Sequence, residues 1–314
     1  MAVDTPAATL GDRLAVYEYR SHDGFFVWNL FPRATHIPAR LDDTAAKVLD
    51  RVPASCQAFL PHLDLSRTHR LPPDRDVLLA ELARRGVRVL NRDLDDTRKS
   101  SLHRVLAAAR LPVAAATAAG DPDELLIVKT DYNYGGMHER ALTRPQREGL
   151  GLAAADPGLA GWADYRVLTR GEMLAQWWRD ETLVVERFVD NAKGEFFRVC
   201  VAGESLSIIR AYSSDQIKKV GAGPRDANFL TRRERLRHLK DNGKLSPHLL
   251  ETVAQFLERT AVEFGTIDIV HEGGDEFYII DLNLTPYGSR RQDLQEVVLD
   301  HLRAGLFPAF AARI

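Results

Sequence analysis

The stretch Phe277-Tyr278-Ile279-Ile280-Asp281-Leu282-Asn283-Leu284-Thr285-Pro286 decides how the rest of the chain is interpreted. It is rich in aromatic and β-branched residues, which predicts a strand. Side chains two positions apart project from the same face of a strand, so Asp281 and Asn283 share one face. Ile280 and Leu282 are then expected to point the other way, into a core.

A second acidic residue extends this pattern. Asp268 lies thirteen positions before Asp281, in the apolar run 265–270. Oxygen-bearing side chains on neighbouring strands suit Mg²⁺, which keeps several waters and takes its other ligands from substrate phosphates. The alternative is turn chemistry, because the turn-forming stretch 285–288 follows directly. The metal interpretation indicates nucleotide chemistry in a chain without a Walker loop.

The composition is that of an ordinary globular protein. The 314 residues suffice for about two domains, and a formal net charge of −2 gives no general attraction to nucleic acid or an anionic membrane. The only cysteines, Cys56 and Cys200, favour a reducing compartment without disulfides. No run approaches the roughly 18 apolar residues of a membrane span, and residues 1–12 lack a secretory signal. We therefore expect a cytoplasmic enzyme.

Alternating strands and helices in the first third of the chain indicate an α/β region. A first strand is expected at 14–19. Asp74 then caps a predicted helix that ends at Gly86, a strand covers 87–91 and a helix covers about 97–110.

The remaining chain predicts further strands, a hairpin and three helices. Ser246 and Pro247 begin the strongest helical pattern, which is expected to end at Gly265. A capping box at Thr169–Glu172 predicts a helix through Trp178. The other expected elements are strands at 125–129 and 183–189, a hairpin at 196–212 and a last helix at about 291–304.

Lys129 ends an apolar strand shortly before Tyr134, Gly135 and Gly136. A lysine there can reach a phosphate as a point charge, and tandem glycines let backbone N–H groups approach phosphate oxygens. A solvated lysine before a flexible turn is the alternative.

The segment Glu186-Arg187-Phe188 continues a buried strand. Extended backbone exposes alternating N–H and C=O groups, which could bind the edge of an adenine while Val185 and Phe188 enclose the ring. The alternative is a plain edge strand.

Arg198 and Arg210 lie on the two strands of the predicted hairpin. Buried arginines need an anionic partner, which is either a carboxylate or a phosphate. The stretch 216–245 carries nine Lys or Arg residues and indicates either a solvated helix face or a basic flap over anionic ligands, with Lys218 and Lys219 nearest the hairpin. Nucleic acid is the weaker alternative, because the stretch has almost no aromatic side chains for stacking.

The order of these sites resembles that of the ATP-grasp superfamily over about residues 87–300. Leu126-Ile127-Val128-Lys129 with Gly135-Gly136 looks like that family's phosphate-covering segment, and 184–189 resembles its adenine-binding linker. Asp268 with 280–286 resembles its magnesium signature. The likeness is to carboxylate–amine ligases of the D-alanine–D-alanine ligase, ribosomal-protein-S6 glutamate ligase and glutathione synthetase type.

The resemblance implies an ATP-grasp fold of mixed α/β and α+β class. An N-terminal α/β domain over 1–92 would precede a central lobe over 93–185 with the Gly-rich loop and a C-terminal lobe over 186–314 with the Mg²⁺ site. The two lobes would enclose ATP. The implied activity is ADP-forming ligation of a carboxylic acid to an amine through an acylphosphate, which yields an amide or peptide bond.

The resemblance also gives each site residue an expected role. Asp268, Asp281 and Asn283 would hold Mg²⁺, two ions in all. Arg198 and Arg210 would act in catalysis by binding phosphate or developing charge. The residues expected to bind ATP are Lys99, Lys129, Tyr134, Gly135, Gly136, Glu186, Arg187, Phe188, Glu195 and Lys218.

Three positions depart from the family's pattern, one of them Tyr287, which stands between Pro286 and Gly288 where the family often has glycine directly. Relatives usually place an acidic residue two before the matched arginine, where this chain has Phe196, and Glu195 would replace it through a shift of register. Thr266 stands where many peptide-forming relatives have an arginine, so that oxyanion contact would come from Arg210 or Arg290.

Two other functions stay open. A small-molecule kinase of the same fold would phosphorylate a hydroxyl. A non-catalytic nucleotide-binding module is the other alternative, but the presence of Asp268, Asp281 and Asn283 together argues against such a module. The substrates are expected to be amino-acid-like small molecules, with neither a membrane nor nucleic acid as partner. The sequence leaves the identity of the substrates and the oligomeric state open, a homodimer included.

Overall fold

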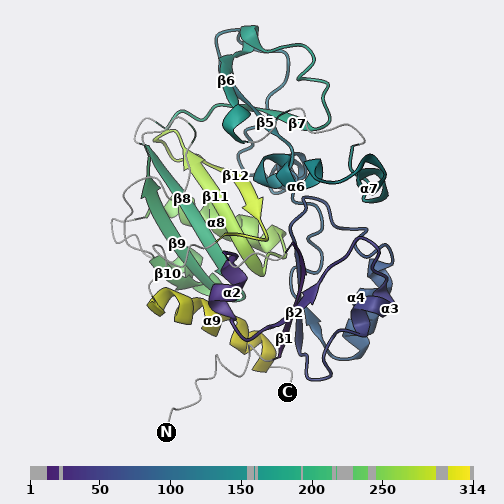
Figure 1. Cartoon of the computed structure of the whole chain (residues 1–314). Coiled ribbons are helices and arrows are strands. Elements are labelled where there is room, and N and C mark those ends of the chain that lie inside the picture. The colour runs from purple at the N-terminus through teal and green to yellow at the C-terminus, as the bar shows by residue number, and fades with distance from the viewer. Residues whose placement is uncertain are drawn as a thin grey trace.

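The computed structural model describes residues 13–20, 24–153, 159, 162–191, 194–213, 217, 229–239, 245–287 and 296–311. The strands of this part form three sheets that follow one another along the chain (Figure 1). The first sheet is parallel, and the other two are antiparallel. This succession confirms the predicted mixture of α/β and α+β structure.

The first sheet has the strand order β2-β1-β3-β4. Parallel neighbours need crossover connections, and α3 and α4 cover one face of the sheet through Val48, Leu79 and Leu82. The carboxyl ends of β1 and β3 therefore lie side by side at one edge. The elements are β1 (Leu14–Tyr19), α2 (Phe26–Leu30), β2 (Thr35–Pro38), α3 (Ala45–Leu49), β3 (Ala58–Leu63), α4 (Arg75–Arg84) and β4 (Arg88–Val89).

The second sheet is small, with the order β6-β5-β7, and the third has the order β10-β9-β8-β11-β12. None of the helices described here is long and apolar enough to cross a lipid bilayer. The second sheet and its neighbours are α5 (Lys99–Ala108), β5 (Leu125–Thr130), α6 (Met137–Arg140), α7 (Arg144–Gly149), β6 (Arg166–Thr169) and β7 (Leu183–Arg187). The third sheet and its helices are β8 (Glu195–Ala202), β9 (Ser205–Tyr212), β10 (Phe229–Arg232), α8 (Pro247–Arg259), β11 (Phe264–His271), β12 (Phe277–Asn283) and α9 (Glu296–Ala311).

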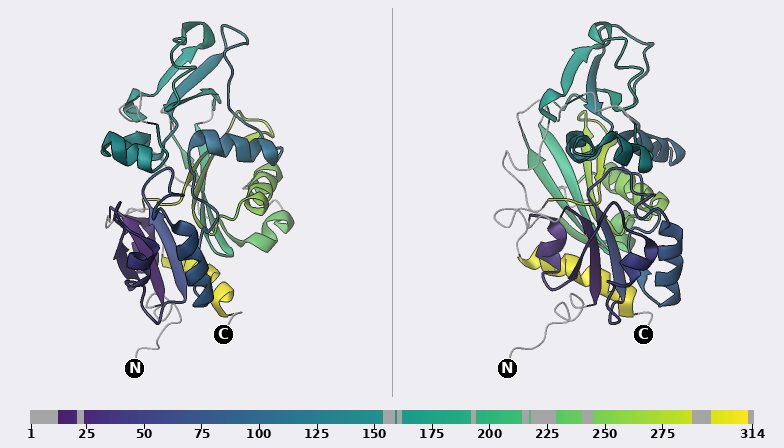
Figure 2. Two further views of the ribbon diagram at one scale, coloured as in Figure 1. Left: turned by 90° about the vertical axis from the view of Figure 1, so that its right-hand side faces the viewer. Right: turned by 45° about the vertical axis from the view of Figure 1, so that its right-hand side comes forward.

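The third sheet lies beside the first sheet and below the second (Figure 1). α5 and α8 cover one of its faces, where Leu106 and Phe256 pack against Val199 and Ile267 (Figure 2). The yellow helix α9 lies between the lower end of this sheet and the first sheet, in a core shared by both. α8 lies on one face of the third sheet. The second sheet lies near the upper end of the third sheet, toward the opposite face (Figure 1).

A β-bulge shapes the β11–β12 pair. Asp268 lies opposite Asp281, but the next pair brings Ile279 against β11, so Ile280 is the extra residue. Ile279 and Leu282 point into the core shared with α8, whereas Ile280 packs on the other face. The expectation that Ile280 accompanies Leu282 into the core is therefore wrong, because the bulge shifts the alternation by one residue.

Two predicted helix boundaries are also wrong. α8 ends at Arg259, and Gly265 lies inside β11, where a Cβ would come 2.6 Å from the Asn283 carbonyl oxygen. The capping box at Thr169–Glu172 forms, but it caps a single 3₁₀ turn. Met173 leaves that turn in an extended conformation and packs against the second sheet, so tertiary packing overrides the local helical signal.

Gly305 sets how closely α9 approaches the turn between β8 and β9. The Glu204 N–H donates to the Gly305 carbonyl oxygen over 2.9 Å, and a Cβ at Gly305 would meet the Ala202 carbonyl oxygen at 2.3 Å. Alanine normally stabilises a helix interior by about 1 kcal/mol relative to glycine. We expect Gly305→Ala to destabilise the protein instead and to lower the thermal unfolding midpoint, because the helix has to move away from the turn.

Gly149→Ala is the matched control for this measurement. Gly149 ends α7, and a Cβ there meets nothing within 4 Å, so this variant should keep or raise the midpoint. A midpoint of Gly305→Ala at or above that of the wild type would contradict the close packing of α9.

Candidate functional site

Three charged side chains form a row across the third sheet, which we call the charged row. The strand register places Arg198 of β8 opposite Asp268 of β11, and Asp268 opposite Asp281 of β12. The Arg198 guanidinium donates two hydrogen bonds of 2.7 Å to the Asp268 carboxylate. Burial alone would lower the pKa of Arg198, but the charge and hydrogen bonds of Asp268 raise it, so the guanidinium stays charged.

Asp281 has an oxygen left for a ligand. Its Oδ1 is buried without a hydrogen-bond partner, and the Lys99 Nζ lies 3.8 Å from it. Asn283 follows on the same face of β12, with its Oδ1 accepting from the Thr285 N–H at 2.8 Å. A buried oxygen without a donor is costly, and a cation would remove that cost. Asp268, Asp281 and Asn283 therefore fit Mg²⁺.

The oxygen atoms on this face could supply only part of the ligands of a metal ion. Within the described ranges, no three His, Cys, Asp or Glu side chains cluster so that they could hold a metal ion by themselves. Mg²⁺ usually binds one or two carboxylates and takes its remaining ligands from waters and substrate phosphates. Two carboxylates and one amide match that pattern.

Lys99 is positioned by a cap from a distant part of the chain. α5 begins at Lys99, and its own N-cap side chain makes no capping hydrogen bond. Asp131, which follows β5, instead accepts hydrogen bonds of 2.7 Å from both the N–H and the hydroxyl of Ser100. The buried Lys99 Nζ donates to the Tyr132 carbonyl oxygen at 3.0 Å. The segment after β5 therefore holds the first turn of α5, and Lys99 with it, beside Asp281.

Lys129, Glu186 and His103 form a buried triad. The Lys129 Nζ contacts Glu186 Oε2, and His103 Nε2 lies 3.0 Å from Glu186 Oε1. Burial would raise the pKa of Glu186, but the charge of Lys129 and the contact with His103 lower it to about 2. Both carboxylate oxygens of Glu186 are thus engaged in holding Lys129 and His103 in place.

An apolar cluster adjoins the charged row on the same face. Its described members are Ala114, Val189, Phe196, Ala211, Val270, Tyr278 and Ile280. The Arg187 guanidinium lies over the Tyr278 ring, 4.9 Å from its centre. The N–H groups of Arg187 and Phe188 already donate to carbonyl oxygens of Ala114 and Leu125. These two N–H groups are therefore not available to a ligand.

The glycine-rich segment is docked against the end of β12. Tyr134, Gly135 and Gly136 have positive φ angles of 49°, 67° and 73°, a region that is uncommon for a residue other than glycine. The Tyr134 hydroxyl donates to the Thr285 carbonyl oxygen and accepts from Asn283 Nδ2 at 3.1 Å. The segment therefore touches a candidate metal ligand directly.

Two predicted site residues do not reach this face. Arg210 lies opposite Phe197, on the face that packs against α8, and Glu195 shares that face. There the Arg210 Nε lies 2.9 Å from Glu195 Oε1. β8 pairs with both neighbours without a register shift, so Glu195 does not take the place of Phe196. Lys218 lies outside the described residues.

Two residues join the site without having been predicted. His103 follows Lys99 by one helical turn, and that four-residue spacing could have revealed it. Tyr165 lies just before β6. Burial raises the pKa of its hydroxyl, and the neighbouring charges of Lys129 and Asp281 act on the same group. No local pattern marks Tyr165, because only the packing of the second sheet over the third brings it here.

The fold has counterparts among solved structures, although no protein-family model matches the sequence. The ATP-grasp ligase PsnB, complexed with a phosphomimetic variant of its minimal precursor, Mg and ADP, matches with a TM-score of 0.50 and 13% identity over 94% of this chain and 98% of PsnB. The VanG D-Ala:D-Ser ligase of Enterococcus faecalis matches with a TM-score of 0.45 and 10% identity over 95% of this chain and 98% of that one. The chain has the ATP-grasp fold, which confirms the predicted fold class.

The Lys129–Glu186 pair predicts a loss of stability in acid. The pKa of Glu186 is about 2 in the folded protein against an ordinary 4.5. Its contribution to stability is therefore complete above pH 4.5 and is lost as the pH falls toward 2. Glu186→Gln should be less stable than the wild type near neutral pH, and the difference in thermal midpoint should shrink between pH 4.5 and 2.

Glu81→Gln is the control, because Glu81 pairs with Arg84 on an exposed helix surface and such pairs contribute little. A difference between Glu186→Gln and the wild type that stays constant across this range of pH would contradict the buried ion pair.

Proposed function

We propose that the chain is an ATP-dependent ligase that joins a carboxylic acid to an amine through an acylphosphate and releases ADP and phosphate. The observation that carries this proposal is the charged row, with Asn283 and Lys99 beside Asp281. Oxygen ligands for a cation lie next to fixed positive charges. Phosphoryl transfer depends mainly on such positioning and charge neutralisation.

The charged side chains have distinct proposed roles. Asp268, Asp281 and Asn283 would hold two Mg²⁺ ions, which when bound would neutralise charge on the β- and γ-phosphates of ATP. Lys99 and Lys129 would bind phosphate oxygens, and the apolar cluster would enclose the adenine ring. The complex of PsnB with Mg and ADP supports this assignment by analogy of fold.

The reaction needs no side-chain nucleophile. The γ-phosphoryl group would pass from ATP to a carboxylate oxygen of the acid, with ADP as the leaving group. The amine nitrogen would then attack the acyl carbon, the carbon–oxygen bond to phosphate would break, and inorganic phosphate would leave. The segment 134–136 would help to keep water from the acylphosphate.

The proposal extends to domains, substrates and location. Residues 93–185 and 186–314 would enclose the nucleotide behind an N-terminal domain of residues 1–92. The substrates would be an amino-acid-like acid and an amine, either small molecules or peptides, since PsnB is seen with a precursor peptide. We place the enzyme in the cytoplasm, where ATP is supplied.

Trapping with hydroxylamine tests the proposed reaction. Given Mg-ATP and its acid, the enzyme should form a hydroxamate and ADP in equal amounts, because hydroxylamine attacks an acylphosphate. A panel of amino acids and small carboxylic acids, tested alone and in pairs, supplies the acid. A phosphorylated alcohol without hydroxamate would indicate a kinase, and failure to bind Mg-ATP would remove the proposal.

Asp281→Asn tests the metal ligands. Loss of one carboxylate from the cation should lower acid-dependent ADP release roughly a hundredfold or more. The variant should still fold, because Asp281 Oδ1 makes no hydrogen bond within the protein, although the thermal midpoint should fall somewhat because Lys99 loses the negative charge 3.8 Å away.

Asp275→Asn is the matched control for Asp281→Asn. Asp275 lies between the same two strands with its side chain 81% exposed, so this variant should keep full activity. Near-normal turnover by Asp281→Asn would exclude the metal assignment.

A further inference from the structure

His103 is the member of the buried triad that has no role in the proposed reaction. Its Nε2 lies 3.0 Å from Glu186 Oε1, and the Lys129 ammonium contacts the other oxygen of the same carboxylate. Glu186 is 2% exposed, so its charge has to be balanced from within the protein. Lys129 alone supplies the one positive charge that is needed. Before a ligand binds, His103 can therefore hold its hydrogen bond to Glu186 as a neutral imidazole.

A bound nucleotide would disturb this balance of charge. Lys129 lies near the charged row, because the Tyr165 hydroxyl interacts electrostatically with both Lys129 and Asp281. When Lys129 binds a phosphate oxygen, its single charge is shared between the phosphate and Glu186. A buried carboxylate that loses part of its counter-charge destabilises the structure. A second cation beside Glu186 would remove that cost.

His103 is placed to become this second cation. Histidine is the side chain whose charge changes most readily near neutral pH. The His103 side chain is 14% exposed, so a proton can reach it from solvent. Protonation would keep the hydrogen bond to Glu186 and add a charge to it, and charge-assisted hydrogen bonds are the stronger ones.

The charged groups next to His103 on α5 have other partners. Lys99 precedes His103 by one helical turn, but its ammonium lies beside Asp281. Arg104 follows His103 directly, and its side chain is 68% exposed and lies nearest to Asp96. Neither of these two cations contacts Glu186 in the described part of the chain, so neither can take over from Lys129.

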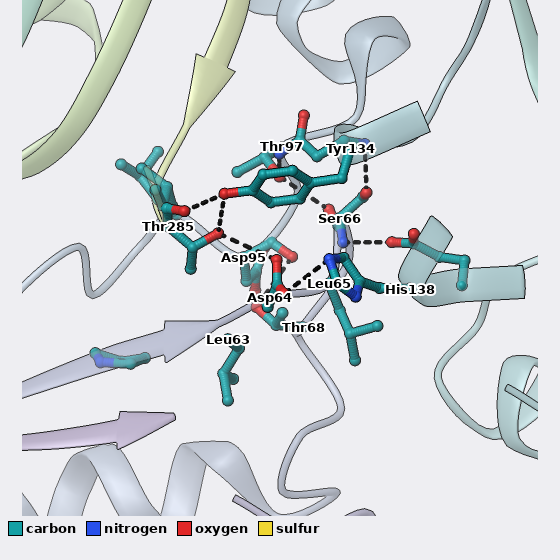
Figure 3. Close-up of a pocket in the computed structure, with 15 residues that line it drawn as sticks. Leu63, Asp64, Leu65, Ser66, Thr68, Asp95, Thr97, Tyr134, His138 and Thr285 are labelled. Carbon is teal, nitrogen blue, oxygen red and sulfur yellow. Dashed lines mark hydrogen bonds and ion pairs between the residues drawn. The ribbon is translucent and has the colours of Figure 1, made fainter. Parts of the chain in front are cut away.

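His138 is a second histidine near the site, and its surroundings differ from those of His103. Its Nε2 lies 2.8 Å from Asp64 Oδ2, on the far side of the Tyr134 ring (Figure 3). Asp64 has no proposed contact with the nucleotide. The charge beside His138 therefore stays the same when the nucleotide binds, and only His103 gains a reason to take up a proton.

We propose that His103 is a positioning residue that takes up a proton when the nucleotide binds and replaces the charge that Lys129 gives to the phosphates. The proton comes from solvent and binds to the ring nitrogen that lacks one. Glu186 then stays ionised and in place while Lys129 turns toward the nucleotide. The inference rests on the proposed function for the role of Lys129, but the uptake of a proton can be measured without turnover.

Isothermal titration with a non-hydrolysable ATP analogue tests the proposal. Binding is measured near neutral pH with excess Mg²⁺, which keeps the phosphates ionised, in buffers of different ionisation enthalpy. The slope of the binding heat against that enthalpy counts the protons taken up. The wild-type protein should take up roughly half a proton or more per nucleotide, because histidine titrates in this range.

His103→Gln separates the charge of His103 from its hydrogen bond. Glutamine keeps a donor for Glu186 but cannot be protonated near neutral pH. The proton uptake of this variant should therefore fall to near zero. No uptake by the wild-type protein, or equal uptake by His103→Gln, would overturn the proposal.

The affinity of the wild-type protein for the analogue covers the case in which His103→Gln fails to fold. Uptake of a proton on binding means that the nucleotide and the proton favour each other's binding. The affinity should therefore rise as the pH falls from about 8 to about 6, the range in which histidine titrates. An affinity that stays constant or falls over this range would also overturn the proposal.

His248→Gln is the matched control variant. His248 also faces a carboxylate, that of Asp275, but these two side chains are 58% and 81% exposed. This variant should keep the proton uptake of the wild-type protein. Proton uptake without hydroxamate formation would count against the proposed reaction alone, and hydroxamate formation without proton uptake would count against the role of His103 alone.

Discussion

The register between β11 and β12 is the constraint on which the rest of the site depends. It places Asp268 directly opposite Asp281. The bulge at Ile280 shifts the alternation of side chains along β12 by one residue, so that Asp281 and Asn283 point away from the core. Gly265 permits this pairing, because any Cβ there would strike the backbone of Asn283. A slip of one residue would move the carboxylate of one strand to the other face of the sheet and separate the two acids.

Each cation of the site is held by a carboxylate: Arg198 by Asp268, Lys129 by Glu186, and Lys99 beside Asp281. Buried charges need such partners, and the pairing fixes the cations before a substrate arrives. Preorganised charge of this kind stabilises a transition state without further reorganisation. The same network joins the second and third sheets through α5, because Lys99 of α5 lies beside Asp281 of β12 and His103 of α5 contacts Glu186 of β7. Stability and the proposed chemistry therefore rest on the same side chains.

The sequence predicts the parts of this architecture that depend on local pattern. Alternation on β12 and the apolar run around Asp268 reveal two strands with oxygen ligands, and the order of the motifs predicts the ATP-grasp fold. It does not reveal the bulge, which depends on pairing between strands, and so it misplaces Ile280. Arg210 looks equivalent to Arg198 in a hairpin pattern, but only the register assigns it to the opposite face.

The central claim is that Asp268, Asp281 and Asn283 form part of a metal site that nucleotide phosphates complete. Isothermal titration with a non-hydrolysable ATP analogue, with and without Mg²⁺, tests this claim most directly. The account predicts that Mg²⁺ strengthens nucleotide binding to the wild-type protein and that Asp281→Asn removes this gain. Nucleotide binding with the same affinity in the presence and absence of Mg²⁺, or an undiminished gain in Asp281→Asn, would contradict the account.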